Sequence, residues 1–182
     1  MVAVFFAEGF EEIEAVTVCD VLKRADIKTV SVGIGSKCIT GAHGIKMLTD
    51  IEIGEVDAEI LDMAVMPGGM PGTANLEKSV IFTDLIISLN EKGKRLAAIC
   101  AAPSILGKLG LLNGVEAICY PGYEKYLYGA VISQNSTVTD GQITTSKGPG
   151  TALAFSLELV RRLKDERTMI KLANSMQYEG TE

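Results

Sequence analysis

The chain has 182 residues, of which 47% are hydrophobic, and it contains 19 glycines and no tryptophan. This length and composition are typical of one compact α/β domain, which we expect to span residues 1–182. The formal net charge of -6 argues against nucleic acid or an anionic membrane as a partner, because both bind basic surfaces.

The first half of the chain alternates short apolar runs with one helical pattern. In chain order it predicts a strand at 2–7, a helix at 11–25, a strand at 27–34, a turn at 41–44, and strands at 45–48 and 61–66. The run at 2–7 has no basic region before it, so it predicts a buried parallel strand and not a signal peptide.

The second half continues the alternation of strands and helices. In chain order it predicts a helix at 80–91, a strand at 96–99, a helix at 103–109, a strand at 115–119, a hairpin at 137–145, a helix at 150–163 and a last helix from 166. The hairpin rests on Asp140-Gly141, a strong signal for a two-residue turn. Strands that alternate with helices predict a mostly parallel sheet between two helix layers, a three-layer sandwich with one small β-hairpin.

The segment Arg95-Leu-Ala-Ala-Ile-Cys-Ala-Ala-Pro103 carries the clearest sign of chemistry. A predicted strand ends on Cys100, and Pro103 suits the first turn of the helix that follows. A thiol on such a turn lies near the unpaired amides of a helix start, which favour the thiolate. Serine hydrolases place their nucleophile on the same kind of turn. A buried structural cysteine is the alternative interpretation.

The register of the first helix places an acid on its inward face. Its apolar stripe comprises Val18, Val21, Leu22 and Ala25. Glu14 lies one turn before this stripe, so burial is expected to raise its pKa, and a protonated Glu beside a thiolate is suited to acid–base catalysis. A Glu14 that reaches solvent past the helix end is the alternative. We interpret Glu11 and Glu12 as first-turn acids that complement the helix dipole.

Two backbone amides are candidates for an oxyanion hole beside Cys100. Gly69 follows a buried strand, where a glycine lets the backbone approach another group closely, and Ala101 directly follows the cysteine. A plain tight turn at Gly69 is the alternative. The lone histidine, His43, lies in a turn far from Cys100 in the sequence, and we interpret it as a loop or interface residue.

The four cysteines, Cys19, Cys38, Cys100 and Cys119, show no C-x-x-C spacing. We therefore expect free thiols in a reducing cytoplasm, and no disulfide or metal site. No run approaches the ~20 apolar residues of a membrane span, so no membrane partner is expected.

Four segments together resemble one family: Ala7-Glu-Gly-Phe-Glu-Glu-Ile-Glu14, Met66-Pro-Gly-Gly69, Ala97-Ala-Ile-Cys-Ala-Ala-Pro103 and Thr145-Ser-Lys-Gly-Pro-Gly-Thr151. In this order they closely resemble the ThiJ/PfpI superfamily, in the branch of the parkinsonism-associated protein deglycase and its bacterial relatives. The resemblance covers essentially the whole chain. It implies a flavodoxin-like sandwich, a homodimer, and no metal or organic cofactor.

The resemblance also implies roles for individual residues. It assigns the nucleophile and redox cysteine to Cys100, its protonated partner to Glu14 and an oxyanion-side glycine to Gly69. It further implies that a loop with Ser146, Gly148 and Pro149 lies near the cysteine, often at the dimer contact.

Three positions depart from the pattern of the superfamily. Protease-like members have a histidine directly after the cysteine, where this chain has Ala101. Some deglycase-branch members have a histidine before a proline, where this chain has Tyr120, which offers a hydroxyl but no base at neutral pH. Lys147 stands where some relatives have an arginine, which removes bidentate anion binding there.

We therefore predict a cysteine-dependent, cofactor-free glyoxalase or deglycase that acts on methylglyoxal-type dicarbonyls or their early adducts. The alternative is a redox sensor or stress-protective protein in which Cys100 is oxidised to a sulfinic acid. A cysteine peptidase is less favoured because Ala101 replaces the histidine. A class I glutamine amidotransferase is less favoured still, since no histidine follows Cys100 to complete its triad.

Overall fold

The computed structural model describes residues 1–180, whose central sheet has the strand order β10-β11-β7-β6-β1-β2-β5. The strands are β1 (Val2–Phe6), β2 (Thr29–Gly33), β5 (Ile51–Glu52), β6 (Met63–Met66), β7 (Arg95–Ile99), β10 (Thr137–Asp140) and β11 (Ile143–Ser146). Neighbouring strands are parallel except for the antiparallel pair β10–β11. Without the two-residue edge strand β5, the parallel strands β2-β1-β6-β7-β11 have the flavodoxin-like order, which confirms the predicted fold class.

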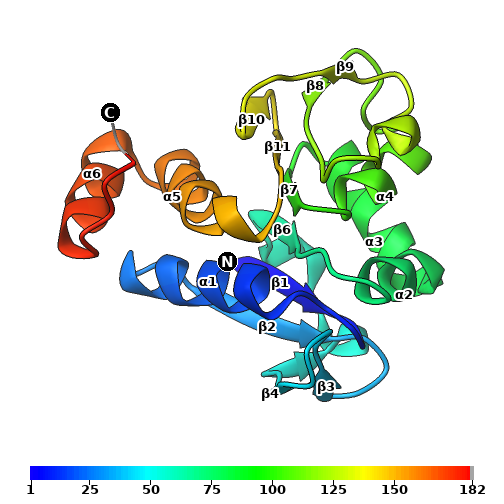
Figure 1. The fold of residues 1–182 in the computed structure, drawn as a ribbon. Helices are drawn as coiled ribbons and strands as arrows, with labels where there is room; N and C mark the ends of the chain where they lie inside the picture. The colour runs from blue at the N-terminus through cyan, green and yellow to red at the C-terminus, as the bar shows by residue number, and fades with distance from the viewer. Residues whose placement is uncertain (181–182) are drawn as a thin grey trace.

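Helices cover both faces of the sheet (Figure 1). One layer contains α1 (Glu12–Arg24), α5 (Ala152–Leu163) and α6 (Glu166–Ser175); the other contains α2 (Gly72–Lys78), α3 (Val80–Glu91) and α4 (Pro103–Lys108). The position of strand β1 between the two helix layers explains why its sequence is apolar throughout. Val4 and Phe6 pack into the core under α1 and α5, whereas Phe5 packs into the opposite core against Phe82 of α3. Alternate side chains thus meet two hydrophobic layers.

Two of the predicted helices, α3 and α6, begin at residues where a side chain caps the first turn. The Ser79 hydroxyl accepts a hydrogen bond from the Phe82 N–H group (3.4 Å) at the start of α3. The Asp165 carboxylate accepts one from the Thr168 N–H group (2.7 Å) at the start of α6. No helix within residues 1–180 is both long enough and apolar enough to cross a membrane.

Several short elements were not predicted from the sequence, among them α2 and β3. Helix α2 follows the glycine-rich segment after β6, and it is too short to show a clear helical period. Strand β3 (Cys38–Thr40) pairs with β4 (Lys46–Leu48) in an antiparallel hairpin outside the main sheet. The predicted strand at 45–48 is therefore one arm of this hairpin.

Two predictions about strands need correction. The run at 115–119 forms only β8 (Glu116–Ala117), which pairs with β9 (Val131–Ile132) in a separate two-stranded sheet. In the β10–β11 hairpin, Asp140 pairs with Ile143, so the loop residues are Gly141 and Gln142 and not Asp140 and Gly141. The positive φ of 56° at Gly141 explains the shift, because this turn needs a glycine at its first central position.

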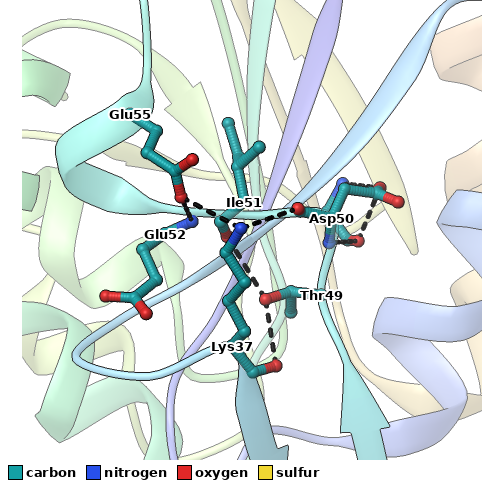
Figure 2. Close-up of polar contacts among 7 residues, drawn as sticks. Lys37, Thr49, Asp50, Ile51, Glu52 and Glu55 are labelled. Carbon is teal, nitrogen blue, oxygen red and sulfur yellow. Dashed lines mark hydrogen bonds and ion pairs between the residues drawn. The ribbon is translucent and has the colours of Figure 1, made fainter.

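Polar contacts tie the β3–β4 hairpin to the edge of the main sheet, as Figure 2 shows. The Asp50 carboxylate accepts hydrogen bonds from the Ser31 N–H group (2.8 Å) and hydroxyl (2.7 Å), which lower the pKa of Asp50. The Thr49 hydroxyl donates to the Lys37 carbonyl (3.1 Å), and the Lys37 ammonium lies 3.2 Å from the Glu55 carboxylate. The hairpin is thereby held at a fixed place beside β2 and β5.

Candidate active site

Four loops meet at the carboxyl ends of neighbouring strands β1, β6, β7 and β11. This edge includes the point between β1 and β6 where the strand order reverses, the usual site of ligands in such sheets. A cleft of about 270 Å³ opens there. Its lining residues are Glu11, Gly69, Met70, Cys100, Ala101, Tyr120, Tyr123 and Pro149.

Cys100 occupies a strained turn, as the sequence predicts. Its φ of 64° lies in the left-handed region, which costs a non-glycine residue about 1–3 kcal/mol. Backbone hydrogen bonds hold this conformation: the Cys100 N–H group donates to the Ser146 carbonyl (3.0 Å), and the Cys100 carbonyl accepts from the Tyr120 N–H group (2.7 Å). Segments from β11 and from the chain after β8 therefore fix the thiol in place.

Glu14 is fully buried, as the register of α1 predicts, with an exposed fraction of 0%. Its Oε2 atom accepts a hydrogen bond from the Gly68 N–H group (2.7 Å). Its Oε1 atom has no hydrogen-bond partner within residues 1–180, and the Glu14 carboxyl group and the Cys100 side chain both lie against Gly68. Burial raises the pKa of Glu14 to about 7. Glu14 is thus poised to hold a proton on Oε1 near neutral pH.

The environment of the Cys100 sulfur differs from the simple expectation of a lowered thiol pKa. Burial, and then the charge of an ionised Glu14, raise the pKa of Cys100 to about 12, although the amides of Gly69 and Ala101 act to lower it. The charge repulsion exists only while Glu14 is ionised. A Glu14 that keeps its proton can instead donate a hydrogen bond to a thiolate, so the two groups titrate as a pair. The expected preference for the thiolate followed from the helix-start amides alone, and burial of the sulfur outweighs them.

The two predicted oxyanion amides, those of Gly69 and Ala101, both act to lower the pKa of Cys100. They can therefore stabilise a thiolate or oxygens bound to it, while their role toward a substrate oxygen stays a prediction. A Cβ atom on Gly69, whose φ is 89°, would lie 2.4 Å from the Glu11 nitrogen. One on Gly68 would lie 2.6 Å from the Cys100 Cβ. Both glycines are required for this close approach of loops.

The supporting residues contribute in different ways. Tyr120 and Pro149 line the cleft, and a Cβ atom on Gly148 would lie 3.2 Å from the Tyr120 ring. The Ser146 side chain is fully buried, and its hydroxyl contacts the Thr137 and Thr151 hydroxyls at 2.8 and 2.7 Å. Ser146 therefore acts on Cys100 through its backbone carbonyl and not through its hydroxyl.

Glu11 and Glu12 do more than complement a helix dipole. Glu11 lines the cleft, and its N–H group donates to the Gly68 carbonyl (2.9 Å). The Glu12 carboxylate accepts from the His43 N–H group and ring Nδ1, both at 2.8 Å, and from the Ile45 N–H group. Ligand atoms of Glu11, Glu12 and His43 lie within 4.8 Å of one another. Because the Glu12 carboxylate already accepts hydrogen bonds from the hairpin turn, we interpret this group as a structural contact between α1 and the hairpin and not as a metal centre.

Comparison with known proteins identifies the family. A model of the DJ-1/PfpI family matches residues 1–162. The chain belongs to this family. It is 32% identical over 176 residues to Protein dj-1beta of Drosophila melanogaster, covering 95% of this chain and 94% of that protein. It spans only 40% of the longer Protein DJ-1 homolog B of Arabidopsis thaliana, at 34% identity over 174 residues.

Two further family members bear on the site. "Glutathione-independent glyoxalase DJR-1.2" of Caenorhabditis elegans is 30% identical over 159 residues, which cover 86% of this chain and 84% of that protein. The solved structure described as "Toxoplasma gondii DJ-1, oxidized" has a TM-score of 0.94 and 32% identity, and the match covers 98% of both chains. The family resemblance drawn from the four sequence motifs is thereby confirmed.

Proposed function

We propose that this chain is a cofactor-independent glyoxalase or deglycase that converts methylglyoxal-type dicarbonyls, or their early adducts, into 2-hydroxy acids. The observation that carries the proposal is the pairing of Cys100, on its left-handed turn, with the buried Glu14 in a cleft of about 270 Å³. A cleft of this size suits a three-carbon substrate. The name of the Caenorhabditis elegans relative supports the same chemistry.

The geometry suggests how the two side chains share the reaction. The Cys100 sulfur attacks the aldehyde carbon, and Glu14 gives its Oε1 proton to the new alkoxide, which yields a hemithioacetal. Glu14, now ionised, carries the hydrogen of that carbon to the neighbouring carbon, while the hydroxyl proton of the first carbon passes to the ketone oxygen. The first carbon is thereby oxidised to a thioester and the second is reduced to an alcohol. Water then hydrolyses the thioester to lactate and the free thiol. A Glu14 pKa of about 7 suits both proton transfers.

Lactate formation from methylglyoxal tests this mechanism. We expect Cys100→Ser and Glu14→Gln each to lower kcat/KM by roughly 10²-fold or more, since each removes a group that acts in the transition state. Cys119→Ser is the matched control, because Cys119 is buried outside the cleft lining and its loss should leave the rate within about twofold. Equal rates in the wild type, Cys100→Ser and Glu14→Gln would exclude the mechanism.

A second function is favoured by the donors around the sulfur. We propose that peroxide oxidises Cys100 to a sulfinate, with two peroxide molecules each delivering one oxygen and leaving as water. The Gly69 and Ala101 amides and a protonated Glu14 are placed to hydrogen-bond the sulfinate oxygens. The relative described as oxidized supports this reading.

Mass spectrometry after mild peroxide treatment separates this function from indiscriminate damage. Selective addition of two oxygens at Cys100, with the exposed Cys38 unchanged, is the expected result. Glu14→Leu removes one hydrogen-bond partner of the sulfinate while keeping the site apolar. Cys100 of this variant should therefore carry one or three added oxygens and not two. Equal oxidation of Cys38 and Cys100 would argue against a sensing role.

A further inference from the structure

The hydroxyl of Thr151 does not do what its place in the fold predicts. Thr151 directly precedes α5, and a threonine there normally caps the helix by accepting a hydrogen bond from an N–H group of the first turn. Within residues 1–180 the Thr151 hydroxyl makes no such bond. It points back toward the 146–149 segment, which joins β11 to the turn before α5. The hydroxyl therefore serves this segment and not the helix.

Three short contacts connect the Thr151 hydroxyl to the 146–149 segment. Its oxygen accepts a hydrogen bond from the Gly148 N–H group (3.2 Å) and lies 2.8 Å from the Gly148 carbonyl oxygen and 2.7 Å from the Ser146 hydroxyl oxygen. Gly148 is buried, and its N–H group has no other acceptor in the part of the chain that the structure describes. Loss of the Thr151 hydroxyl would thus leave a buried donor unpaired, which is unfavourable.

The 146–149 segment in turn contacts the Cys100 turn. The Ser146 carbonyl accepts the hydrogen bond from the Cys100 N–H group (3.0 Å) that helps to hold the left-handed φ of 64°. A Cβ atom on Gly148 would lie 4.0 Å from the Cys100 sulfur, and Pro149 lines the cleft. A strained turn persists only where its surroundings hold it, so the place of this segment decides the place of the sulfur.

We propose that the Thr151 hydroxyl is a positioning group for Cys100. By pairing with Gly148 and Ser146, it holds the 146–149 segment where that segment keeps the Cys100 turn strained and its sulfur partly buried. The inference rests on the proposed glyoxalase function and adds to it a residue that takes no part in bond making. Without the hydroxyl, the segment moves outward so that water reaches the Gly148 N–H group, and the Cys100 sulfur becomes more exposed and less well placed for attack.

Thr151→Val tests this role, because valine has nearly the shape of threonine and lacks the hydroxyl. We expect kcat/KM for methylglyoxal to fall roughly tenfold or more, since small displacements of reacting groups have effects of this size. Thr151→Ser keeps the hydroxyl and should recover most of the loss. Thr139→Val is the matched control, because the half-buried Thr139 hydroxyl contacts Thr144 (2.9 Å) and Glu158 (2.8 Å) outside the cleft. Its kcat/KM should stay within about twofold of the wild type.

A second readout does not depend on turnover. Iodoacetamide alkylates thiols, and peptide mass spectrometry measures the rate at Cys100 alone, in samples that urea unfolding shows to be folded. Burial is the main cause of the raised pKa of Cys100, so the more exposed sulfur of Thr151→Val should react about threefold faster or more. Thr151→Ser and Thr139→Val should react at close to the wild-type rate.

The two readouts separate this role from the glyoxalase proposal. Faster alkylation of Cys100 in Thr151→Val alone supports the positioning role even if the wild type does not turn over methylglyoxal, and in that case only the glyoxalase proposal fails. Three results would each overturn the positioning role: turnover by Thr151→Val equal to that of an active wild type, alkylation of its Cys100 no faster than in the wild type, or an equal acceleration in Thr139→Val.

Discussion

At the residue scale, Glu14 holds the central position of the site. Its Oε2 atom is fixed by the Gly68 amide, and its free Oε1 atom is left to exchange a proton with Cys100 or a substrate. Ionising a group that is 0% exposed is unfavourable, and this is the physical cause of its raised pKa. Burial therefore makes Glu14 useful as an acid and base. It also lowers the free energy of unfolding when Glu14 loses its proton.

Glu14→Gln should stabilise the protein more strongly at high pH than at low pH. The folded pKa of Glu14 is raised from 4.5 to about 7, so its favourable protonated form is fully present below about pH 4.5 and is lost as the pH rises through 7. Urea unfolding at about pH 5 and about pH 8 should show the gain of the variant over the wild type growing by roughly 3 kcal/mol. Glu91→Gln, on the surface of α3, is the control. A gain that does not change with pH would contradict the raised pKa.

Gly68→Ala should strongly lower turnover while largely preserving the fold. The added Cβ atom would lie 2.6 Å from the Cys100 Cβ and 2.9 Å from the Glu14 Oε2 atom, so the two reacting side chains must separate. We expect kcat/KM for methylglyoxal to fall roughly 10²-fold, since small displacements of reacting groups have effects of this size. Gly54→Ala, where a Cβ atom meets open space, is the control for a glycine replacement. Normal turnover in Gly68→Ala would contradict this prediction, because it would mean that the loop containing Gly68 moves without separating Cys100 and Glu14.

At the element scale, the contact between α1 and the β3–β4 hairpin positions one wall of the site. Burial acts to raise the pKa of Glu12, but its hydrogen bonds with the hairpin outweigh this and lower it. Its partner His43 has a raised pKa, chiefly through the hydrogen bond to Glu12. Protonated His43 therefore holds the hairpin against α1 most firmly below its raised pKa, and this contribution is lost as the pH rises through that value.

The titration of His43 can be measured directly because it is the single histidine of the chain. We expect its NMR-detected pKa to lie above 6.5 in the wild type and to fall toward that value in Glu12→Gln, which keeps the side-chain shape but removes the charge. Glu91→Gln again serves as the control. An unchanged His43 pKa in Glu12→Gln would mean that the hydrogen bond between His43 and Glu12 does not hold the hairpin against α1.

At the scale of the whole molecule, exposed apolar side chains on α1 and the hairpin form one surface. They are Ile13, Val16, Ile45 and Leu48, and Leu48 is 77% exposed. Glu12 binds the Ile45 backbone and directly precedes Ile13, so the two elements present these side chains together. Clustered exposed apolar groups mark association surfaces. We propose that a second copy of the chain covers this face in a homodimer.

Charge placed on this surface should separate the proposed dimer. In sedimentation at micromolar concentration we expect a dimer for the wild type and a monomer for Ile13→Asp, because a desolvated carboxylate would lie in the contact. Ile81→Asp is the matched control, since Ile81 is also exposed (61%) but lies on α3 in the opposite helix layer. A monomeric wild type, or equal dissociation by Ile81→Asp, would contradict this contact face.

The sequence by itself determined the layered fold, the turn at Cys100 and the inward placement of Glu14. These follow from hydrophobic periods and turn chemistry, which act over a few residues and can be read locally. Short elements were less predictable: α2 and β3 are too brief to show a period, and β8 ends early because its partner is β9 and not the main sheet.

The tertiary structure alone decided which distant groups meet. The Gly68 amide binds Glu14 from 54 positions away, and the hairpin binds Glu12 from more than 30. The coupled titration of Glu14 and Cys100 belongs to the same class. Such contacts depend on how loops pack across the ends of the sheet, and no local pattern in the chain encodes that packing.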